Sequence, residues 1–327
     1  MTRLIRRLLT LTVVLALLAV AGWLGLAGAL QRAAAQVLTG QQAAPVTATA
    51  VQAGGFPAAL SLRLHDPALH GQGWGWTAPV ADLSVATLAP NRLRLVLPAQ
   101  QSVTLGGQVL ALTAAAMGGA LTVAPRSDLR LRSLTLGGQS VRLGDLAAAA
   151  QVEAAVTQPA DTPRADIAAA ARDLTLPPAL LAALPPGMAL PPTIAGASVQ
   201  ARLGLTAPLD RFSAEAPLAL TAIELDGAAL DWGDLALRAE GKLTPDAQGF
   251  AEGRVMVHVT GWRVLMPLLT ATGVVKPEVA ATVETALSRL AVKGPEGGDG
   301  RLDLPVIFRG GRVSLGPMPM GQAPRFP

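Results

Sequence analysis

Three ionisable side chains near residue 65 have the types that could do chemistry. His65, Asp66 and His70 could form an acid/base pair or share a metal ion, because imidazole and carboxylate groups move protons and bind zinc. The spacing gives no third ligand, although Asp82 is available further along the chain. The alternative is a histidine at the end of a strand, followed by an aspartate that caps a turn before Pro67. We expect this second, structural role.

Known catalytic and nucleotide-binding motifs are absent from the chain of 327 residues. It contains no G-x-S-x-G, P-loop, H-E-x-x-H or G-x-G-x-x-G sequence. It also has no cysteine, which excludes disulfides, thiolate metal sites and cysteine nucleophiles. His258 lies in an apolar segment, where we expect a histidine whose partner is a neighbouring strand. We therefore predict a protein that is not an enzyme, with no catalytic residues, no metal and no cofactor.

Two tryptophans and four arginines are candidates for contact with lipid. Trp74 and Trp76 are two residues apart, so in an extended chain both rings face the same way. They could support acyl chains or lie at a membrane interface, or they could fill the core. Four arginines alternate with apolar residues on two segments: Arg92, Arg94, Arg130 and Arg132. These could contact anionic headgroups or simply form a solvated face of a sheet.

The elements that would hold these residues are mostly strands. Residues 61–65 and 92–97 alternate apolar and polar side chains, and a period of two indicates a strand with one dry and one wet face. Turns are predicted at Asp66-Pro67, Ala89-Pro90-Asn91 and Gly106-Gly107. The sequence T-L-G-G-Q occurs twice, which predicts a similar hairpin turn at Gly137-Gly138. The glycines from Gly71 to Gly75 indicate a loop or bulge around the tryptophans.

Helices are predicted at only a few places. An Ala-rich helix is expected from Asp145, its N-cap, to Val156. The Pro-rich segment 177–192 allows one short helical turn, and 164–176 favours a strand. The C-terminal third predicts the strands 218–225, 229–243 and 251–260, the helices 262–272 and 277–292, and a hairpin turn at Gly310-Gly311. The tail 316–319 contains two prolines and is not expected to continue a sheet.

Composition indicates an unusually apolar chain. Apolar residues make up 51% and charged residues 15%, whereas an ordinary globular chain has about 25% charged residues. The mean hydropathy is +0.43, so many strands must be apolar on at least one face. We predict a mainly β (α+β) fold, in which a large curved antiparallel sheet with a few packed helices follows one N-terminal transmembrane helix.

The N-terminal segment 8–30 carries no charge and is long enough to cross a bilayer. Arg3, Arg6 and Arg7 precede it, which places the N-terminus in the cytoplasm. The alternative is a signal peptide cleaved near Ala27-Gly28-Ala29. We favour an anchor, which makes the protein a single-pass protein of the bacterial inner membrane with its main domain in the periplasm.

These predictions divide the chain into consecutive regions. They are a basic cytoplasmic N-terminus (1–7), the anchor or signal peptide (8–30), a linker and entry to the domain (31–53), and a periplasmic β-rich domain (54–327) with two halves that meet near 144–192. The formal charge is +4, with a pI of about 10.5. Aromatic residues make up only 3% and no dense basic run occurs, so nucleic acid is not expected as a partner.

The motifs between residues 55 and 100 occur in the order found in an uncharacterised envelope family of alphaproteobacteria, the "domain of unknown function 2125" group. The chain resembles that family at Gly55-Phe56-Pro57, Asp66-Pro67, Gly73-Trp74-Gly75-Trp76, Pro90-Asn91 and, near its end, Gly310-Gly311-Arg312-Val313. The resemblance implies an anchored periplasmic domain and supplies no catalytic residue. More loosely, the ending of strands, two helices and a hairpin is similar to AsmA-like envelope proteins, whose long curved sheets are linked to lipid handling.

Two functions fit these observations. The first is a non-catalytic membrane-anchored protein that binds phospholipid, or helps to transport it, through an apolar concavity of its sheet. The second is an envelope scaffold or assembly factor that binds another protein through a sheet edge or the Pro-rich segment. They differ in whether the apolar face is an open groove or a closed core.

Overall fold

The computed structural model describes residues 46–54, 59–71, 73–86, 88–160, 162–185, 190–210, 212, 219–271, 277–292, 300–315 and 318–326. The predicted segments 1–7 and 8–30 lie outside these residues, and so does most of the predicted linker 31–53. Within the part of the chain that is described, no helix has the length and apolar character needed to span a membrane.

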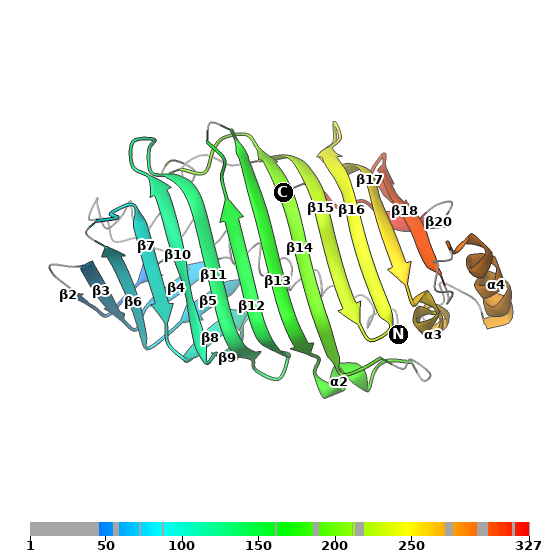
Figure 1. Cartoon of the computed structure of the whole chain (residues 1–327), viewed down its shortest axis with the longest axis horizontal. Helices are drawn as coiled ribbons and strands as arrows, with labels where there is room; N and C mark the ends of the chain where they lie inside the picture. Colours follow the sequence, from blue (N-terminus) through cyan, green and yellow to red (C-terminus); the bar gives the residue numbers. More distant parts are fainter. Residues whose placement is uncertain are drawn as a thin grey trace. The chain divides into compact units, whose positions relative to one another are not determined.

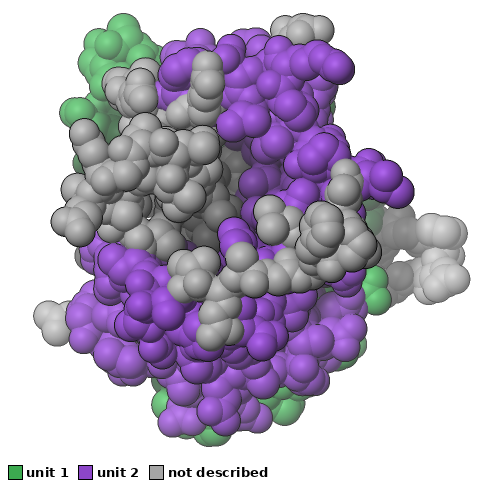
Figure 2. Space-filling model, turned by 90° about the vertical axis from the view of Figure 1, so that its left-hand side faces the viewer, with its two compact units in different colours: residues 1–16, 172–203, 220–327 green, residues 17–171, 204–219 purple. Residues whose placement is uncertain are grey.

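The chain divides into two compact units (Figure 2). Unit 1 comprises residues 1–16, 172–203 and 220–327, and unit 2 comprises residues 17–171 and 204–219. The strand pairs whose register is known are antiparallel in both units. The predicted mainly β, antiparallel fold is therefore confirmed.

Unit 2 holds the strands β1 to β12 and the start of β13. Their bounds are β1 (Val46–Thr47), β2 (Ala50–Gly54), β3 (Ala59–His65), β4 (Ala68–Gly71), β5 (Trp74–Thr77), β6 (Val80–Ala86), β7 (Arg92–Leu97), β8 (Gln100–Leu105), β9 (Gln108–Thr113), β10 (Ala116–Ala124), β11 (Arg130–Leu143), β12 (Ala147–Thr157) and β13 (Arg164–Thr175). Figure 1 shows β4, β5 and β8 behind the layer that contains β6, β7 and β10.

The short strands of unit 2 join end to end into long bent strands. For example, β3 pairs with β6, and β4, which follows β3, pairs with β5, which precedes β6. The register continues across the junction, because His65 lies opposite Val80 and Ala68 lies opposite Thr77. In the same way β1 continues into β2, β7 into β8 and β9 into β10. Unit 2 is therefore a meander of long strands that all bend along one line.

We call this line the crease. Its residues are Asp66-Pro67, Ala78-Pro79, Pro98-Ala99 and Ala114-Ala115 between the strands, with Ser140 inside β11. Proline has no N–H to donate, so inside a sheet it is confined to irregular positions such as these. Asp66 and Ser140 have φ angles of 45° and 50°, which are bulge conformations for residues with a side chain. Backbone hydrogen bonds from Asp66 N to the Pro79 carbonyl (3.0 Å) and from Ala78 N to the Pro67 carbonyl (3.1 Å) tie neighbouring strands together here.

The crease keeps the apolar side chains on one side of the sheet. In the bent strand formed by β9 and β10, the inward residues are Leu110 and Leu112 before the crease and Gly119 and Leu121 after it. The inward side chains therefore have even residue numbers before the bend and odd residue numbers after it, because one extra residue is inserted at the bend. Small residues fill the inside of the bend, where Ala114 is only 4% exposed.

Unit 1 is a second meander of antiparallel strands. Its strands are the end of β13, most of β14 (Thr193–Leu205), β15 (Leu220–Trp232), β16 (Leu235–Pro245), β17 (Ala251–Thr260), β18 (Arg301–Arg309), β19 (Arg312–Leu315) and β20 (Met318–Gln322). Each strand from β15 to β20 pairs with the next one. Its helical segments are α2 (Pro178–Leu181), η1 (Trp262–Leu265), α3 (Met266–Ala271), η2 (Pro277–Val279) and α4 (Ala280–Leu290). The two predicted C-terminal helices and the short turn in the Pro-rich segment are thus confirmed.

A closed core forms where η1 and α3 meet the sheet of unit 1. Leu235 and Trp262 are each 2% exposed, and Leu302 is 3% exposed. Trp232 donates its indole N–H to the carbonyl of Pro191 at 2.7 Å, so its polar edge is satisfied as its ring is buried.

Two local predictions in unit 2 are wrong. The Ala-rich segment expected to be a helix from Asp145 is the strand β12, paired along its length with β11. Alanine favours a helix only weakly, and pairing with a long neighbouring strand outweighs that preference. Gly137-Gly138 is not a turn but lies inside β11, where Gly137 faces Gly118 of β10. A side chain at Gly138 would lie 2.6 Å from the side chain of Val141, so that position has no room for one. On the neighbouring strand, a side chain at Gly119 would lie 2.4 Å from the Thr135 carbonyl.

Other corrections concern strand ends. Asp66-Pro67 is part of the crease instead of a turn, and the glycines around Trp74 belong to a regular hairpin of β4 and β5. The predicted strand 229–243 is two strands, β15 and β16, joined at Gly233 with a φ of 59°. The tail continues the sheet as β20, which pairs with β19 and tolerates proline. The predicted turns at Gly106-Gly107 and Gly310-Gly311 are confirmed, with positive φ at all four glycines.

Candidate functional site

Among the described residues, an apolar face in unit 2 is a candidate binding surface. Six leucines line it, from four neighbouring strands: Leu83, Leu93, Leu95, Leu121, Leu134 and Leu136. Strand register places Leu83 opposite Leu95, Leu93 opposite Leu121, and Leu121 opposite Leu134. We refer to these six leucines as the apolar face.

The apolar face surrounds a shallow recess of about 20 Å³ whose lining is almost entirely carbon. Gly119 lies between Leu95 and Leu136 and supplies no side chain, which leaves the space for the recess. Apart from Leu134, which is 4% exposed, the leucines are only half-buried. Such a surface can hold a chain of methylene groups but offers no group for acid/base or metal chemistry.

The two tryptophans lie on the other side of the crease, on β5. Trp76 donates its indole N–H to Gln101 Oε1 at 2.7 Å. Gln101 is 5% exposed; its Nε2 donates to the Pro98 carbonyl at 2.9 Å and lies 3.4 Å from the sulfur of Met117. These contacts join β5, β8 and β10 on the inside of the bend. Trp76 therefore helps to hold the crease together.

Trp74 packs within its own hairpin. A side chain at Gly71 would lie 2.1 Å from Trp74 Nε1, so the ring covers that glycine. Both tryptophans are half-buried. The structure does not bring them together with the arginines of β7 and β11. Sequence reasoning missed Gln101, and the signal that could have found it is its position three residues after Pro98, as the second glutamine of the pair Gln100-Gln101.

The candidate arginines lie on the opposite, polar side of the sheet from the leucines. Arg92 and Arg94 are exposed on β7, and Arg132 is exposed on β11. Within the described part of the chain, these three arginines have no ion-pair or hydrogen-bond partner. The strand between them presents Ala120 and Thr122, opposite Arg94 and Arg92 respectively. Arg130, at the first position of β11, is half-buried.

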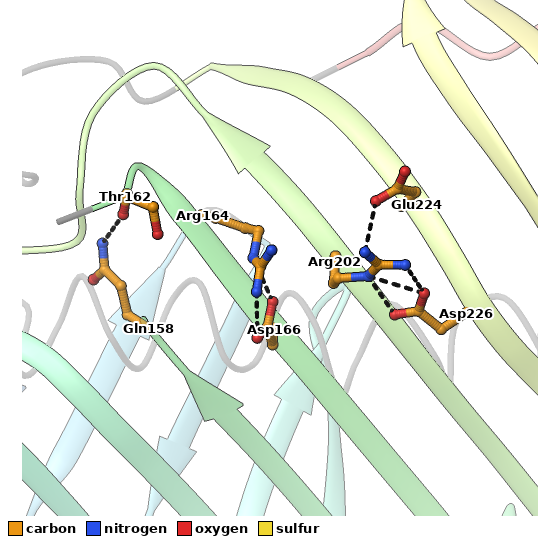
Figure 3. A network of polar contacts seen from close by, with 7 residues as sticks. All are labelled: Gln158, Thr162, Arg164, Asp166, Arg202, Glu224 and Asp226. Carbon is orange, nitrogen blue, oxygen red and sulfur yellow. Dashed lines mark hydrogen bonds and ion pairs between the residues drawn. The ribbon is translucent and has the colours of Figure 1, made fainter. Parts of the chain in front are cut away.

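Unlike these arginines, several other arginines on the polar faces are paired. Arg63 of β3 donates to Asp82 of β6 at 2.7 Å, and this hydrogen bond holds the pKa of the Asp82 carboxyl below its ordinary value. Arg164 and Asp166 pair on β13 in unit 2 (Figure 3). In unit 1, Arg202 of β14 lies between Glu224 and Asp226 of β15 and pairs with both (Figure 3).

Of the histidine and aspartate positions considered from the sequence, Asp66 and His258 have hydrogen-bond partners on neighbouring segments. Asp66 accepts a hydrogen bond from Thr49 Oγ1 at 2.9 Å, across the crease. No group of three or more histidine, aspartate or glutamate side chains among the described residues is placed to hold a metal ion. His258 of β17 lies 2.5 Å from Asp303 of β18 through its Nδ1, which confirms the expected partner on a neighbouring strand.

Comparison with known proteins identifies a family but assigns no activity. No curated protein matches this chain. No solved structure matches it either, so the looser similarity to AsmA-like proteins stays a prediction. One family model, described as "Uncharacterized protein conserved in bacteria (DUF2125)", matches residues 23–324. That range covers most of the chain and includes every residue of the crease and of the apolar face. The chain belongs to the DUF2125 family of uncharacterised bacterial proteins.

Proposed function

We propose that this protein binds the acyl part of a lipid on the apolar face of unit 2. The observation that supports the proposal most directly is the set of half-buried leucines around a carbon-lined recess. A soluble sheet normally covers such a face completely, because exposed apolar area costs about 25 cal/mol per Å². Leucines that stay partly uncovered on four adjacent strands suggest a surface kept for a ligand.

The size of the recess favours transient binding over storage. At about 20 Å³ it is far smaller than the ~300 Å³ of the smallest ordinary ligand pockets. Covering six methylene groups would contribute about 5 kcal/mol, while association costs about 4 kcal/mol or more. An acyl chain would therefore lie along the face and exchange readily. This is the behaviour expected of a protein that helps lipid to move.

The cellular location that we propose follows from the sequence. The uncharged segment 8–30, with Arg3, Arg6 and Arg7 before it, would anchor the chain in the inner membrane and leave the sheet in the periplasm. There the sheet would meet phospholipid released from a bilayer. We propose a non-catalytic role without cofactor, since the apolar face carries no titratable group.

The alternative is an envelope scaffold that binds another protein through a sheet edge or the Pro-rich segment. In unit 1 that segment is held at its C-terminal end, where the Leu176 N–H donates to the Pro192 carbonyl at 3.0 Å and Trp232 donates to Pro191. A segment tied down in this way is less available to a partner. We therefore place the scaffold role second.

Photo-cross-linking tests the proposal on the full-length protein. A phospholipid with a diazirine in its acyl chain is added, and the cross-linked residues are mapped by mass spectrometry. We expect cross-links in β7 and β11 that excess unlabelled phospholipid removes. Leu95→Gln should weaken them about fivefold, because it replaces part of the apolar contact with a polar group.

The matched control is Val96→Gln. Val96 is the next residue on the same strand, is apolar and 49% exposed, and lies on the opposite face. It should leave the cross-links unchanged. If labelling is absent from the apolar face, or if both variants reduce it equally, lipid binding on this face is wrong and the scaffold role becomes the better explanation.

A further inference from the structure

Two neighbouring turns at one end of the meander in unit 2 expose large apolar side chains. Leu88 lies between β6 and β7 and is 99% exposed. Leu129 lies between β10 and β11 and is 36% exposed, in a left-handed conformation with a φ of 55°. A single exposed leucine is ordinary, whereas two on neighbouring turns give one end of the meander an apolar character.

The two turns form one continuous edge. The Val123 N–H donates to the Asn91 carbonyl at 3.0 Å, and Asn91 Nδ2 donates to the Val123 carbonyl at 3.4 Å. Asn91 belongs to the first turn and Val123 immediately precedes the second. We call residues 88–91 and 125–129 the turn edge. Because hydrogen bonds join the turns, Leu88 and Leu129 are carried by one rigid support.

Arginines surround the turn edge. Arg126 is exposed within the second turn, and Arg92 and Arg132 are exposed one to three residues beyond the ends of the two turns. Asp128 is the acidic residue of the second turn. Exposed leucines at a tip with arginines behind them match the chemistry of an anionic bilayer surface, where apolar groups enter the headgroup layer and guanidinium groups contact phosphates.

The opposite end of the same strands provides an internal comparison. It exposes Val109, which is 68% exposed, and Leu146, which is 38% exposed. Its cation is Arg142, and Asp145 in the adjacent turn offsets that charge. The two ends therefore expose apolar side chains to a similar degree but differ in charge. Of these two ends, only the turn edge combines exposed leucines with an excess of arginine.

We propose that the turn edge docks on an anionic bilayer, with Leu88 and Leu129 in the headgroup layer and Arg92, Arg126 and Arg132 against lipid phosphates. The apolar face begins beside this edge, since Leu93 follows Arg92 directly and lies opposite Leu121. Docking would thus set the strand ends at the membrane, where an acyl chain could reach the leucines. The proposal concerns a separate surface and does not require that the apolar face bind lipid.

The absence of cysteine from the chain permits a direct test on the full-length protein. Leu88→Cys and Val109→Cys each give a single site for an environment-sensitive fluorophore, and both side chains are exposed, so folding should not change. Each labelled protein is reconstituted in phosphatidylcholine vesicles, with or without phosphatidylglycerol, that carry a nitroxide quencher in the headgroup layer.

We expect strong quenching at Leu88→Cys in the vesicles that contain phosphatidylglycerol, and little at Val109→Cys. Raising the salt concentration to about 1 M, where the Debye length is about 3 Å, should reduce the quenching. Adding Arg92→Gln, Arg126→Gln and Arg132→Gln should weaken docking by about fivefold for each arginine removed. Arg254→Gln, an exposed arginine on the polar face of unit 1, is the control and should change nothing.

Equal quenching at the two positions, or none at Leu88→Cys, would overturn docking through this edge. Quenching that is as strong without phosphatidylglycerol would overturn the role of the arginines. Failure of the diazirine cross-linking would refute binding on the apolar face and leave this result unaffected, so the two proposals can fail separately.

Discussion

One cluster of charged side chains in unit 1 and the arginines of β7 in unit 2 use arginine in opposite ways. In unit 1, Glu224 accepts ion pairs from Arg202 at 3.1 Å and from Lys242 at 3.2 Å, so charges are joined across neighbouring strands. In unit 2, Arg92 and Arg94 stand on a strand whose described neighbours provide no partner. A protein that needed these arginines only for solubility could have paired them as unit 1 does. Unpaired arginines on a well-ordered strand are available to an external anion.

The apolar side chains of the two units also differ, in how much of their surface is exposed. Leu235 and Trp262 in unit 1 are 2% exposed, whereas the leucines of the apolar face in unit 2, apart from Leu134, remain half-buried. Unit 1 thus has a closed core around Leu235 and an ion-pair cluster around Glu224, whereas these leucines and arginines of unit 2 remain open. Under our proposals, these open leucines and arginines of unit 2 are the binding surfaces, while the closed core of unit 1 contributes stability.

The strongest test of this comparison is the loss of one leucine from each unit. Leu235→Ala should lower the free energy of unfolding by about 2–5 kcal/mol, since it leaves a cavity in a closed core. Leu95→Ala should cost about 1 kcal/mol, because part of its side chain is already in contact with solvent. Hydrogen exchange of the amides in β16 and β7, measured on the full-length protein, would report each loss locally.

Equal losses at the two positions would contradict the comparison. They would mean that the apolar face of unit 2 is as closed as the core of unit 1 and is not available to a ligand. Added phospholipid should slow exchange in β7 of the unmodified protein if the face binds acyl chains, since a ligand stabilises the state that it binds.

The local elements of the fold could be predicted where one short segment decides the structure. The alternation in β7 and the positive φ of Gly106 and Gly107 depend on a few adjacent residues, and both were recognisable. The strand β12 was not, because its alanines favour a helix and pairing with the long strand β11 outweighs that preference. Gly137-Gly138 failed for a related reason, since both residues lie inside a paired strand and the side chains of Val141 and Val152 fill the space beside Gly138.

The crease could not be derived from single segments. Asp66-Pro67 and Ala78-Pro79 each suggest a local break, and only the register between strands shows that these breaks align. The candidate arginines on β7 were predicted as an exposed face, and they are exposed. The turn edge was not predicted, because the exposure of Leu88 depends on how far the turn extends beyond the sheet.

A smaller effect is expected from the charged residues. Glu224→Gln removes the partner of Lys242 and one partner of Arg202 and should cost about 0.5–1 kcal/mol, the range of partly exposed ion pairs. Arg94→Gln should change the free energy of unfolding by less than about 0.5 kcal/mol, because no partner is lost. Thermal unfolding monitored by circular dichroism would compare the two. A larger loss for Arg94→Gln would show that this arginine has a structural role and would remove the contrast between the polar faces.

The smallest effect is a pKa difference between two aspartates, one in each unit. Hydrogen bonds from Arg301 and then His258 hold the pKa of Asp303 below its ordinary value, and a hydrogen bond from Arg63 does the same for the pKa of Asp82. A lowered pKa in the folded state means that each carboxylate contributes stability above the unfolded pKa of about 3.9, and that this contribution is lost as the pH falls through the folded pKa. Asp303→Asn should therefore flatten the loss of stability at acid pH.

The two aspartates should respond differently when their arginines are removed. Arg301→Gln should raise the pKa of Asp303 only partly, because the hydrogen bond with His258 remains. Arg63→Gln should return the pKa of Asp82 to its ordinary value or above, because Arg63 is the largest cause of the lowering and burial acts in the opposite direction. Carboxyl carbon resonances followed by NMR during an acid titration would measure both values. Complete recovery at Asp303 would show that the hydrogen bond with His258 contributes nothing to its pKa, and that Arg301 and Asp303 form a pair on β18 in which β17 takes no part.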